Sequence, residues 1–128
     1  MNPTISSSET GGMPEKKNAR ELVLAYLQAL NDENFKLARR YVSDEMEFNG
    51  ALASLQGADA IFAELERMRL RYDVKKVFAD GNDVCVFYDV TLSGVKLFTG
   101  GWYQIKNQKV RSLKVVFDPH PVLAAKAA

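Results

Sequence analysis

The second half of the chain alternates runs of β-branched and aromatic residues with short turn clusters, and this alternation constrains the fold more than any other feature. The runs cover residues 72–79, 83–92, 95–105 and 109–117. The links between them contain the turn-forming pairs Gly81-Asn82, Ser93-Gly94 and Asn107-Gln108. Short links of this kind favour tight reversals between neighbouring strands. The pattern therefore predicts a four-stranded antiparallel meander.

The first half of the chain shows helical spacing instead. One apolar face is formed by Ala19, Leu22, Val23, Tyr26, Leu27 and Leu30. Asn34 is placed to cap a second, shorter helix, and a third helix is expected to begin near Ala58. Between these two helices we expect a short strand at about residues 45–49 and then a loop. Helices followed by antiparallel strands indicate an α+β domain with its helices on one face of the sheet.

Length and composition indicate one soluble globular domain. The chain has 128 residues, of which 47% are hydrophobic and 26% are charged. Residues 1–14 contain mostly polar and small residues, so we expect a disordered N-terminal tail, a single domain over residues 15–120 and a C-terminal tail over 121–128. Met13 stands where the expected domain begins, and the sequence leaves open whether translation starts at Met1 or Met13.

Charge and cysteine content argue against several classes of function. The formal net charge is only +1, which disfavours a dedicated nucleic-acid binder. Cys85 is the single cysteine and His120 the single histidine, so we expect no internal disulfide, no metal site and no cofactor. No apolar run approaches the length of a membrane span, and no signal peptide is recognised. We therefore expect a cytoplasmic protein without a membrane partner.

Both faces of the long strands carry apolar side chains, although helices can cover only one of them. Phe98 and Trp102 oppose Leu97 and Tyr103 on one such strand. We therefore expect Phe98 and Trp102 to form the outer face of the sheet, where a second copy of the chain would cover them in a homodimer. The alternative is that the two side chains are simply half-exposed in a monomer.

Three stretches of sequence, taken in order, resemble the SnoaL-like branch of the nuclear transport factor 2-like superfamily. They are YLQALNDENFKLARRYVSDEMEF at residues 26–48, QGADAIFAELERM at 56–68 and GGWYQIKNQKVRSLKVVFDP at 100–119. The resemblance implies a cystatin-like α+β roll, in which a strongly bent mixed or antiparallel sheet forms a cone around three N-terminal helices and an apolar pocket opens inside. Members of this superfamily include isomerases, epoxide hydrolases, polyketide cyclases, dehydratases and binding modules, so the resemblance implies a pocket rather than one reaction.

Comparison with the ketosteroid isomerases of this superfamily matches one of three functional positions. Tyr26 matches their oxyanion-stabilising tyrosine. The position of their general base falls on Gly50, or on Asn49 if the register slips by one, and that of their second acid falls on Gly101. Since none of these residues can transfer a proton, we do not expect isomerase chemistry by that route.

Comparison with the limonene-type epoxide hydrolases leaves one acid, Asp89. Their arginine position falls on Phe87 and their last-strand acid on Val115. We expect Asp89 on the inner face of the sheet together with Cys85 and Phe87, where burial would raise its pKa toward neutrality. The alternative is that Asp89 only accepts a hydrogen bond within the core.

Two hypotheses of function follow. The first is a dimeric binding module for a small, largely apolar molecule, with a pocket lined by Phe48, Asn49, Leu65, Phe87, Leu97, Val115 and Phe117. The second is an acid–base enzyme of the isomerase, lyase or epoxide-hydrolase type, with Asp89, Tyr26 and Tyr103 as its catalytic residues. For both tyrosines the alternative is a core position with the hydroxyl bound to a backbone carbonyl.

Overall fold

The structure is a computed structural model that describes residues 17–121 of the chain. The N-terminal tail expected at residues 1–14, and residues 122–128 of the expected C-terminal tail, lie outside the described residues. The described part contains three helices and six strands in the order α1 (Ala19–Asn31), α2 (Phe35–Arg40), β1 (Val42–Asn49), β2 (Ser54–Gln56), α3 (Ala58–Met68), β3 (Arg71–Asp80), β4 (Asp83–Leu92), β5 (Val95–Lys106) and β6 (Lys109–Phe117).

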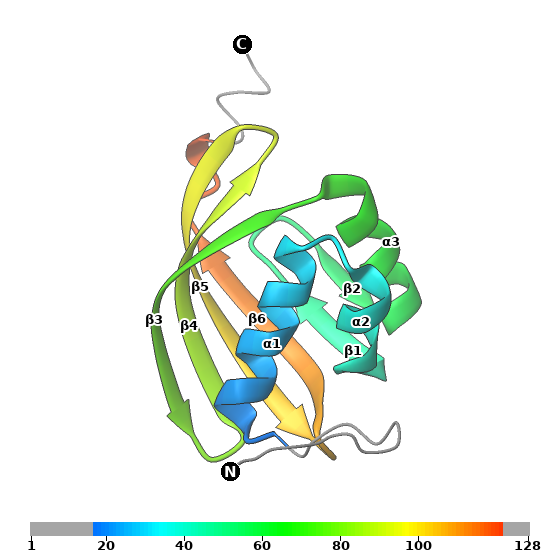
Figure 1. Cartoon of the computed structure of the whole chain (residues 1–128). Helices are drawn as coiled ribbons and strands as arrows, with labels where there is room; N and C mark the ends of the chain where they lie inside the picture. The colour runs from blue at the N-terminus through cyan, green and yellow to red at the C-terminus, as the bar shows by residue number, and fades with distance from the viewer. Residues whose placement is uncertain (1–16, 122–128) are drawn as a thin grey trace.

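The strands form one mixed sheet that curves around the helices. Its order is β2-β1-β6-β5-β4-β3, with β1 parallel to β6 and every other neighbouring pair antiparallel. Helix α1 lies against the concave face, while α2 and α3 stand near the β1–β2 end of the sheet (Figure 1). The predicted α+β cone, with three helices and an antiparallel meander, is confirmed.

Strand β2 departs from the sequence prediction, which placed a loop between the first strand and the third helix. The amide of Gly50 donates to the carbonyl of Ala53 at 2.8 Å and closes a tight turn. This turn brings Leu55 back opposite Phe48 in an antiparallel pair. A three-residue strand is too short to leave a clear alternation in the sequence, which explains why it was missed.

The helix boundaries follow from side-chain capping and from backbone conformation. Asn18 and Glu21 form a capping box at the start of α1, and Asn34 caps α2 as predicted. Helix α3 begins after Gly57, which has a φ of 89° and supplies no side-chain cap, and ends at Arg69 in the left-handed region. Among the described helices, none combines the length and apolar character that crossing a bilayer requires.

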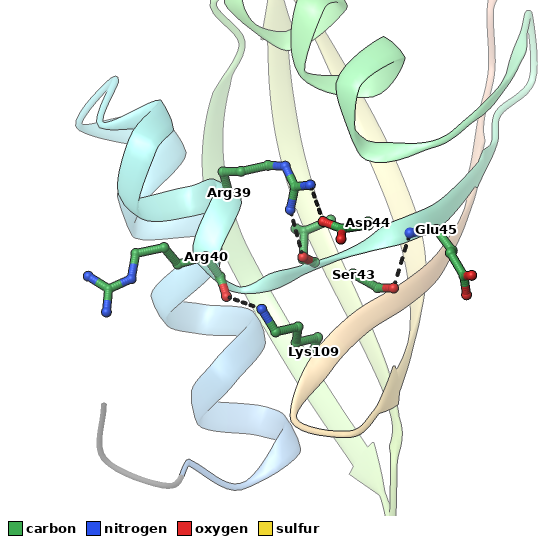
Figure 2. Close-up of polar contacts among 7 residues, drawn as sticks. Arg39, Arg40, Ser43, Asp44, Glu45 and Lys109 are labelled. Carbon is green, nitrogen blue, oxygen red and sulfur yellow. Dashed lines mark hydrogen bonds and ion pairs between the residues drawn. The ribbon is translucent and has the colours of Figure 1, made fainter. Parts of the chain in front are cut away.

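A network of polar contacts joins α2 to β1 (Figure 2). The guanidinium group of Arg39 donates to the carbonyl of Val42 at 3.0 Å and to the carboxylate of Asp44. The Nζ atom of Lys109, at the start of β6, donates to the carbonyl of Arg40 at 3.4 Å. The hydrogen bond from Arg39 lowers the pKa of the Asp44 carboxyl. These contacts fix the end of the short helix α2 against the sheet.

Candidate functional site

The register between β4 and β5 decides which residues face the inside of the cone. Asp89 pairs directly with Phe98, and Cys85 pairs with Trp102. Directly paired residues project from the same face of a sheet. The opposite face of β4 carries Val84, Val86, Tyr88 and Val90, which are all buried against the helices. Asp89, Phe87 and Cys85 therefore lie on the convex face.

The expected position of Asp89 on the inner wall is thus wrong. Its side chain is 19% exposed, and its carboxylate lies 3.8 Å from the Nζ atom of Lys75 on the adjacent strand. Asp73 occupies the paired position on β3. The physical reason lies in the other alternating set of β4, the buried residues from Val84 to Val90, which are all apolar. Burying that set costs less free energy than burying Asp89 and Thr91.

Two expected pocket residues also lie outside the cone. Phe87 shares the convex face with Asp89, and its ring stacks on Phe98 with centroids 6.1 Å apart. Asn49 is exposed, pairs with Lys114 and accepts a hydrogen bond from Ser54 Oγ at 3.0 Å. Because side chains alternate between the two faces of a strand, an assignment that is wrong by one residue places each of them on the wrong face.

Four of the other five expected pocket residues face the helices from the sheet, and the fifth, Leu65, lies on α3 and packs against the core. Leu97 is buried, while Phe48, Leu65, Val115 and Phe117 are partly buried. The register places Phe48 beside Leu113, Val115 beside Gly101 and Phe117 beside Thr99. We call these five apolar residues the apolar wall.

Four tyrosines meet at the centre of the cone. They are Tyr26 on α1, Tyr72 on β3, Tyr88 on β4 and Tyr103 on β5. The ring of Tyr26 meets that of Tyr103 edge to face at a centroid distance of 6.4 Å, and the rings of Tyr72 and Tyr88 lie 5.5 Å apart. The hydroxyl oxygens of Tyr88 and Tyr103 are 2.7 Å apart and share a hydrogen bond. We call these four residues the tyrosine cluster.

The hydroxyls of the tyrosine cluster are held in their neutral form. Burial raises the pKa of Tyr26, Tyr72 and Tyr103 well above the ordinary value. Burial also raises the pKa of Tyr88 to about 12, although its hydrogen bond with Tyr103 acts in the opposite direction. Each of these groups is therefore a hydrogen-bond donor at neutral pH rather than a base or a nucleophile.

Gly101 provides the space that the Tyr88 hydroxyl occupies. A Cβ atom at position 101 would lie 2.4 Å from the Tyr88 oxygen and 3.1 Å from Cε1 of Tyr103. At the position that the resemblance matches to the second acid of ketosteroid isomerases, the Tyr88 hydroxyl therefore leaves no room for a side chain. Gly50, one of the two positions matched to their base, is also crowded, since a Cβ atom there would lie 2.9 Å from the ring of Phe48.

Tyr26 and Tyr103 were expected at the site from the sequence, whereas Tyr72 and Tyr88 were not. The structure brings Tyr26 and Tyr103 into contact and separates both from Asp89 by the thickness of the sheet. The signal for Tyr88 was present in the alternation of Val84, Val86 and Val90, which assigns residue 88 to the buried face. Tyr72 stands at the start of a mostly exposed strand and gave no comparable signal.

A groove of about 640 Å³ runs between α2 and α3 on the outside of the cone. Its walls carry charged side chains from both helices, Lys36 and Arg39 opposite Asp59 and Glu66. The buried ring of Phe62 lines the groove and meets Tyr26 edge to face at 6.5 Å. None of the expected pocket residues lines this groove, and Phe62 stands between it and the tyrosine cluster.

The convex face of the sheet presents an exposed apolar patch. Its members and their exposed fractions are Phe78 at 54%, Phe98 at 64%, Trp102 at 42% and Val116 at 71%. The Nζ atom of Lys114 lies 5.0 Å from the centroid of the Trp102 ring, and the Trp102 indole donates to Asp83 at 2.9 Å. We call these four residues the convex patch. Aromatic residues gathered in this way on a surface are typical of protein interfaces.

Remaining titratable residues offer little chemistry. Within residues 17–121, no three His, Cys, Asp or Glu side chains are grouped closely enough to hold a metal ion. His120 is exposed, and its backbone amide donates to the carboxylate of Asp118 at 3.0 Å. The tyrosine cluster and the apolar wall beside it are therefore the candidate site.

The model of the SnoaL-like domain family matches residues 23–113 of the chain. The chain belongs to the SnoaL-like family. This SnoaL-like domain is also similar to a solved nuclear transport factor 2-like protein of unknown function from Cytophaga hutchinsonii. The two share 35% identity with a TM-score of 0.84, over 87% of this chain and 99% of the other.

More distant solved structures share the fold. An LEH-like epoxide hydrolase from M. tuberculosis is 21% identical with a TM-score of 0.72, over 87% of this chain and 90% of that one. A putative ketosteroid isomerase from Kribbella flavida is 14% identical with a TM-score of 0.72, over 78% and 77% of the two chains. Comparison with curated protein sequences finds no match. The relatives thus establish the superfamily of this SnoaL-like domain without assigning it a reaction.

Proposed function

We propose that this SnoaL-like domain is a homodimeric binding module that holds a small, largely apolar molecule inside its cone. The observation that carries the proposal is the chemistry of the concave face. In strands β3, β4, β5 and β6, the residues that alternate onto this face are aliphatic or aromatic, apart from Thr99 and Gly101. The Thr99 hydroxyl is already bound to the carbonyl of Leu97 at 3.0 Å.

The partly buried apolar residues supply the contact surface for such a molecule. Phe48, Leu65 and Val115 pack against the core but keep part of their surface exposed. Covering that surface with an apolar ligand is favourable by about 25 cal/mol per Å². The tyrosine cluster adjoins these residues on the concave face, because Val115 pairs with Gly101 and Leu113 pairs with Tyr103.

The acid–base alternative receives less support. It required Asp89 to act on the same substrate as Tyr26 or Tyr103, but Asp89 lies on the convex face beside Lys75. The tyrosines are donors with raised pKa values and do not accept protons from carbon at neutral pH. A passive pocket needs neither a base nor a nucleophile.

Two neighbouring valines allow a matched test of the binding proposal. Val115 faces the cone and Val116 is 71% exposed on the convex face. Titration with the apolar fluorescent probe N-phenylnaphthylamine should show saturable binding to the wild type. Val115→Phe should weaken that binding by about tenfold through occlusion, whereas Val116→Phe should leave it unchanged. Equal effects of the two substitutions, or no saturable binding to the wild type, would contradict the proposal.

A further inference from the structure

One of the two O–H groups of Tyr88 and Tyr103 donates no hydrogen bond within the described residues. Each phenol carries one O–H group, and the hydrogen bond of 2.7 Å between the two oxygens uses only one of them. Within residues 17–121, the structure shows no other hydrogen bond made by either hydroxyl. Both residues are 1% exposed. A buried donor without an acceptor is costly, so this O–H group calls for an oxygen or nitrogen atom from outside the chain.

We propose that the Tyr88–Tyr103 hydroxyl pair is the polar anchor of the binding site, and that the ligand presents a neutral hydrogen-bond acceptor such as a carbonyl oxygen. This inference rests on the proposed function, since it names the class of molecule that the cone holds. One hydroxyl donates to the other, and the second donates to the ligand.

The neutrality of the ligand follows from the charges around the pair. Strands β3 to β6, which surround the pair, place no Lys, Arg or His side chain on the concave face, so an anion beside the pair would find no counter-ion on these strands. They place no carboxylate there either, which disfavours a cation. The phenols themselves stay protonated at neutral pH. A neutral acceptor on an apolar body is the remaining chemistry.

The position of the pair fits a ligand that lies on the apolar wall. Gly101 carries no side chain and pairs with the partly buried Val115 on β6 and with Val86 on β4. The Tyr88 oxygen lies over Gly101, where a Cβ atom would be only 2.4 Å away. A molecule resting on Val115 therefore has the hydroxyl pair as its nearest polar neighbour on the concave face. The rings of Tyr26 and Tyr72 hold the pair from either side.

Two probes of the same shape separate this inference from the proposed function. Acetylnaphthalene carries a carbonyl, and the corresponding isopropylnaphthalene replaces it by carbon. If the site binds only apolar surface, the two probes should have equal affinities, apart from the cost of removing water from the carbonyl of acetylnaphthalene. A buried hydrogen bond to the hydroxyl pair predicts about tenfold tighter binding of acetylnaphthalene. The fluorescence of the naphthalene ring reports both titrations.

Phenylalanine substitutions test whether the Tyr88–Tyr103 hydroxyl pair causes the tighter binding of acetylnaphthalene. The double variant Tyr88→Phe/Tyr103→Phe should abolish the preference for acetylnaphthalene, because a hydroxyl left alone in a single variant still carries an O–H group that can donate to the ligand. Tyr41→Phe is the control for the loss of a tyrosine hydroxyl, because Tyr41 is partly buried and lies at the end of α2, outside the tyrosine cluster. It should retain the full preference. Isotope-edited NMR of the tyrosine rings supplies a readout in the wild type, where acetylnaphthalene alone should shift the resonances of Tyr88 and Tyr103.

The outcomes are distinguishable. Equal binding of the two probes to the wild type overturns the inference but leaves the proposed function standing. A preference that survives the double substitution also overturns it. Loss of affinity for both probes in the double variant assigns the pair a merely structural role. If neither probe binds the wild type, the proposed function fails, and this inference fails with it.

Discussion

Asp89 on β4 pairs directly with Phe98 on β5, so the carboxylate and the exposed phenyl ring share the convex face of the sheet. This one pairing removes the acid from the interior of the cone and places it at the edge of the convex patch. It also separates the surface expected to bind a partner from the face expected to bind a ligand. The two can therefore be tested independently.

Asp89→Asn should leave the binding of N-phenylnaphthylamine unchanged. The carboxylate lies 3.8 Å from the Nζ atom of Lys75 on the convex face. The apolar wall lies on the opposite face of the sheet, out of its reach. A partly exposed ion pair of this kind contributes less than about 1 kcal/mol to stability. Probe titration and urea unfolding of the variant measure both quantities. A clear loss of affinity would show that Asp89 acts on the ligand after all.

Phe98→Asp should convert the proposed homodimer into a monomer. The ring is 64% exposed in the single chain and stands among the other residues of the convex patch. A charge at the centre of an apolar interface is costly to desolvate. Sedimentation velocity gives the mass of each species. Leu52→Asp, at an exposed leucine outside the patch, is the control and should remain dimeric. A monomeric wild type at micromolar concentration would contradict the dimer.

Gly101→Ala should destabilise the domain much more than Gly100→Ala. At position 101 the new methyl group collides with the buried Tyr88 hydroxyl, which we expect to cost about 1–3 kcal/mol. At position 100 the nearest atom belongs to the ring of Phe87 on the convex face, 3.3 Å away, and that ring has room to shift. Denaturant unfolding of the two variants compares the costs. Equal destabilisation would indicate that the backbone bend, rather than the hydroxyl, requires glycine.

Stability should fall in strongly alkaline solution because of the tyrosine cluster. In the unfolded chain, tyrosine ionises near pH 10, whereas burial raises the pKa of Tyr88 in the folded protein to about 12. The unfolded state therefore releases protons first, and stability that is complete below about pH 10 is lost as the pH rises toward 12. Tyr88 alone accounts for about 2–3 kcal/mol of this loss.

Unfolding by urea at a series of alkaline pH values tests this dependence, with tyrosinate absorbance followed in parallel. Tyr88→Phe should make the decline shallower, and Tyr41→Phe should not. A wild type whose tyrosines all titrate as in free solution while the domain stays folded would contradict the burial argument.

Local sequence patterns were sufficient for the three helices, for strands β3 to β6 and for the resemblance to the superfamily, but not for the short strand β2. The stripe from Leu22 to Leu30 produces α1 because helical periodicity places those residues on one face. Asn34 caps α2 because its side chain accepts from the amide of Leu37. The turns at Gly81 and Gly94 adopt positive φ values, which glycine permits without strain. Each of these outcomes depends on residues a few positions apart in the chain.

The facing of the strands was decided only by the tertiary structure. On β4 one alternating set is wholly apolar and favours burial, but Cys85 and Phe87 in the other set left an inward Asp89 as a sequence expectation. The choice was made by the pairing of β4 with β5 and by the volume that α1 fills above Tyr88 and Val86. The hydroxyl pair likewise depends on Gly101, thirteen positions from Tyr88 in the sequence. Sequence therefore determined the elements and their order, whereas long-range packing, which no local pattern encodes, determined which side chains meet inside the cone.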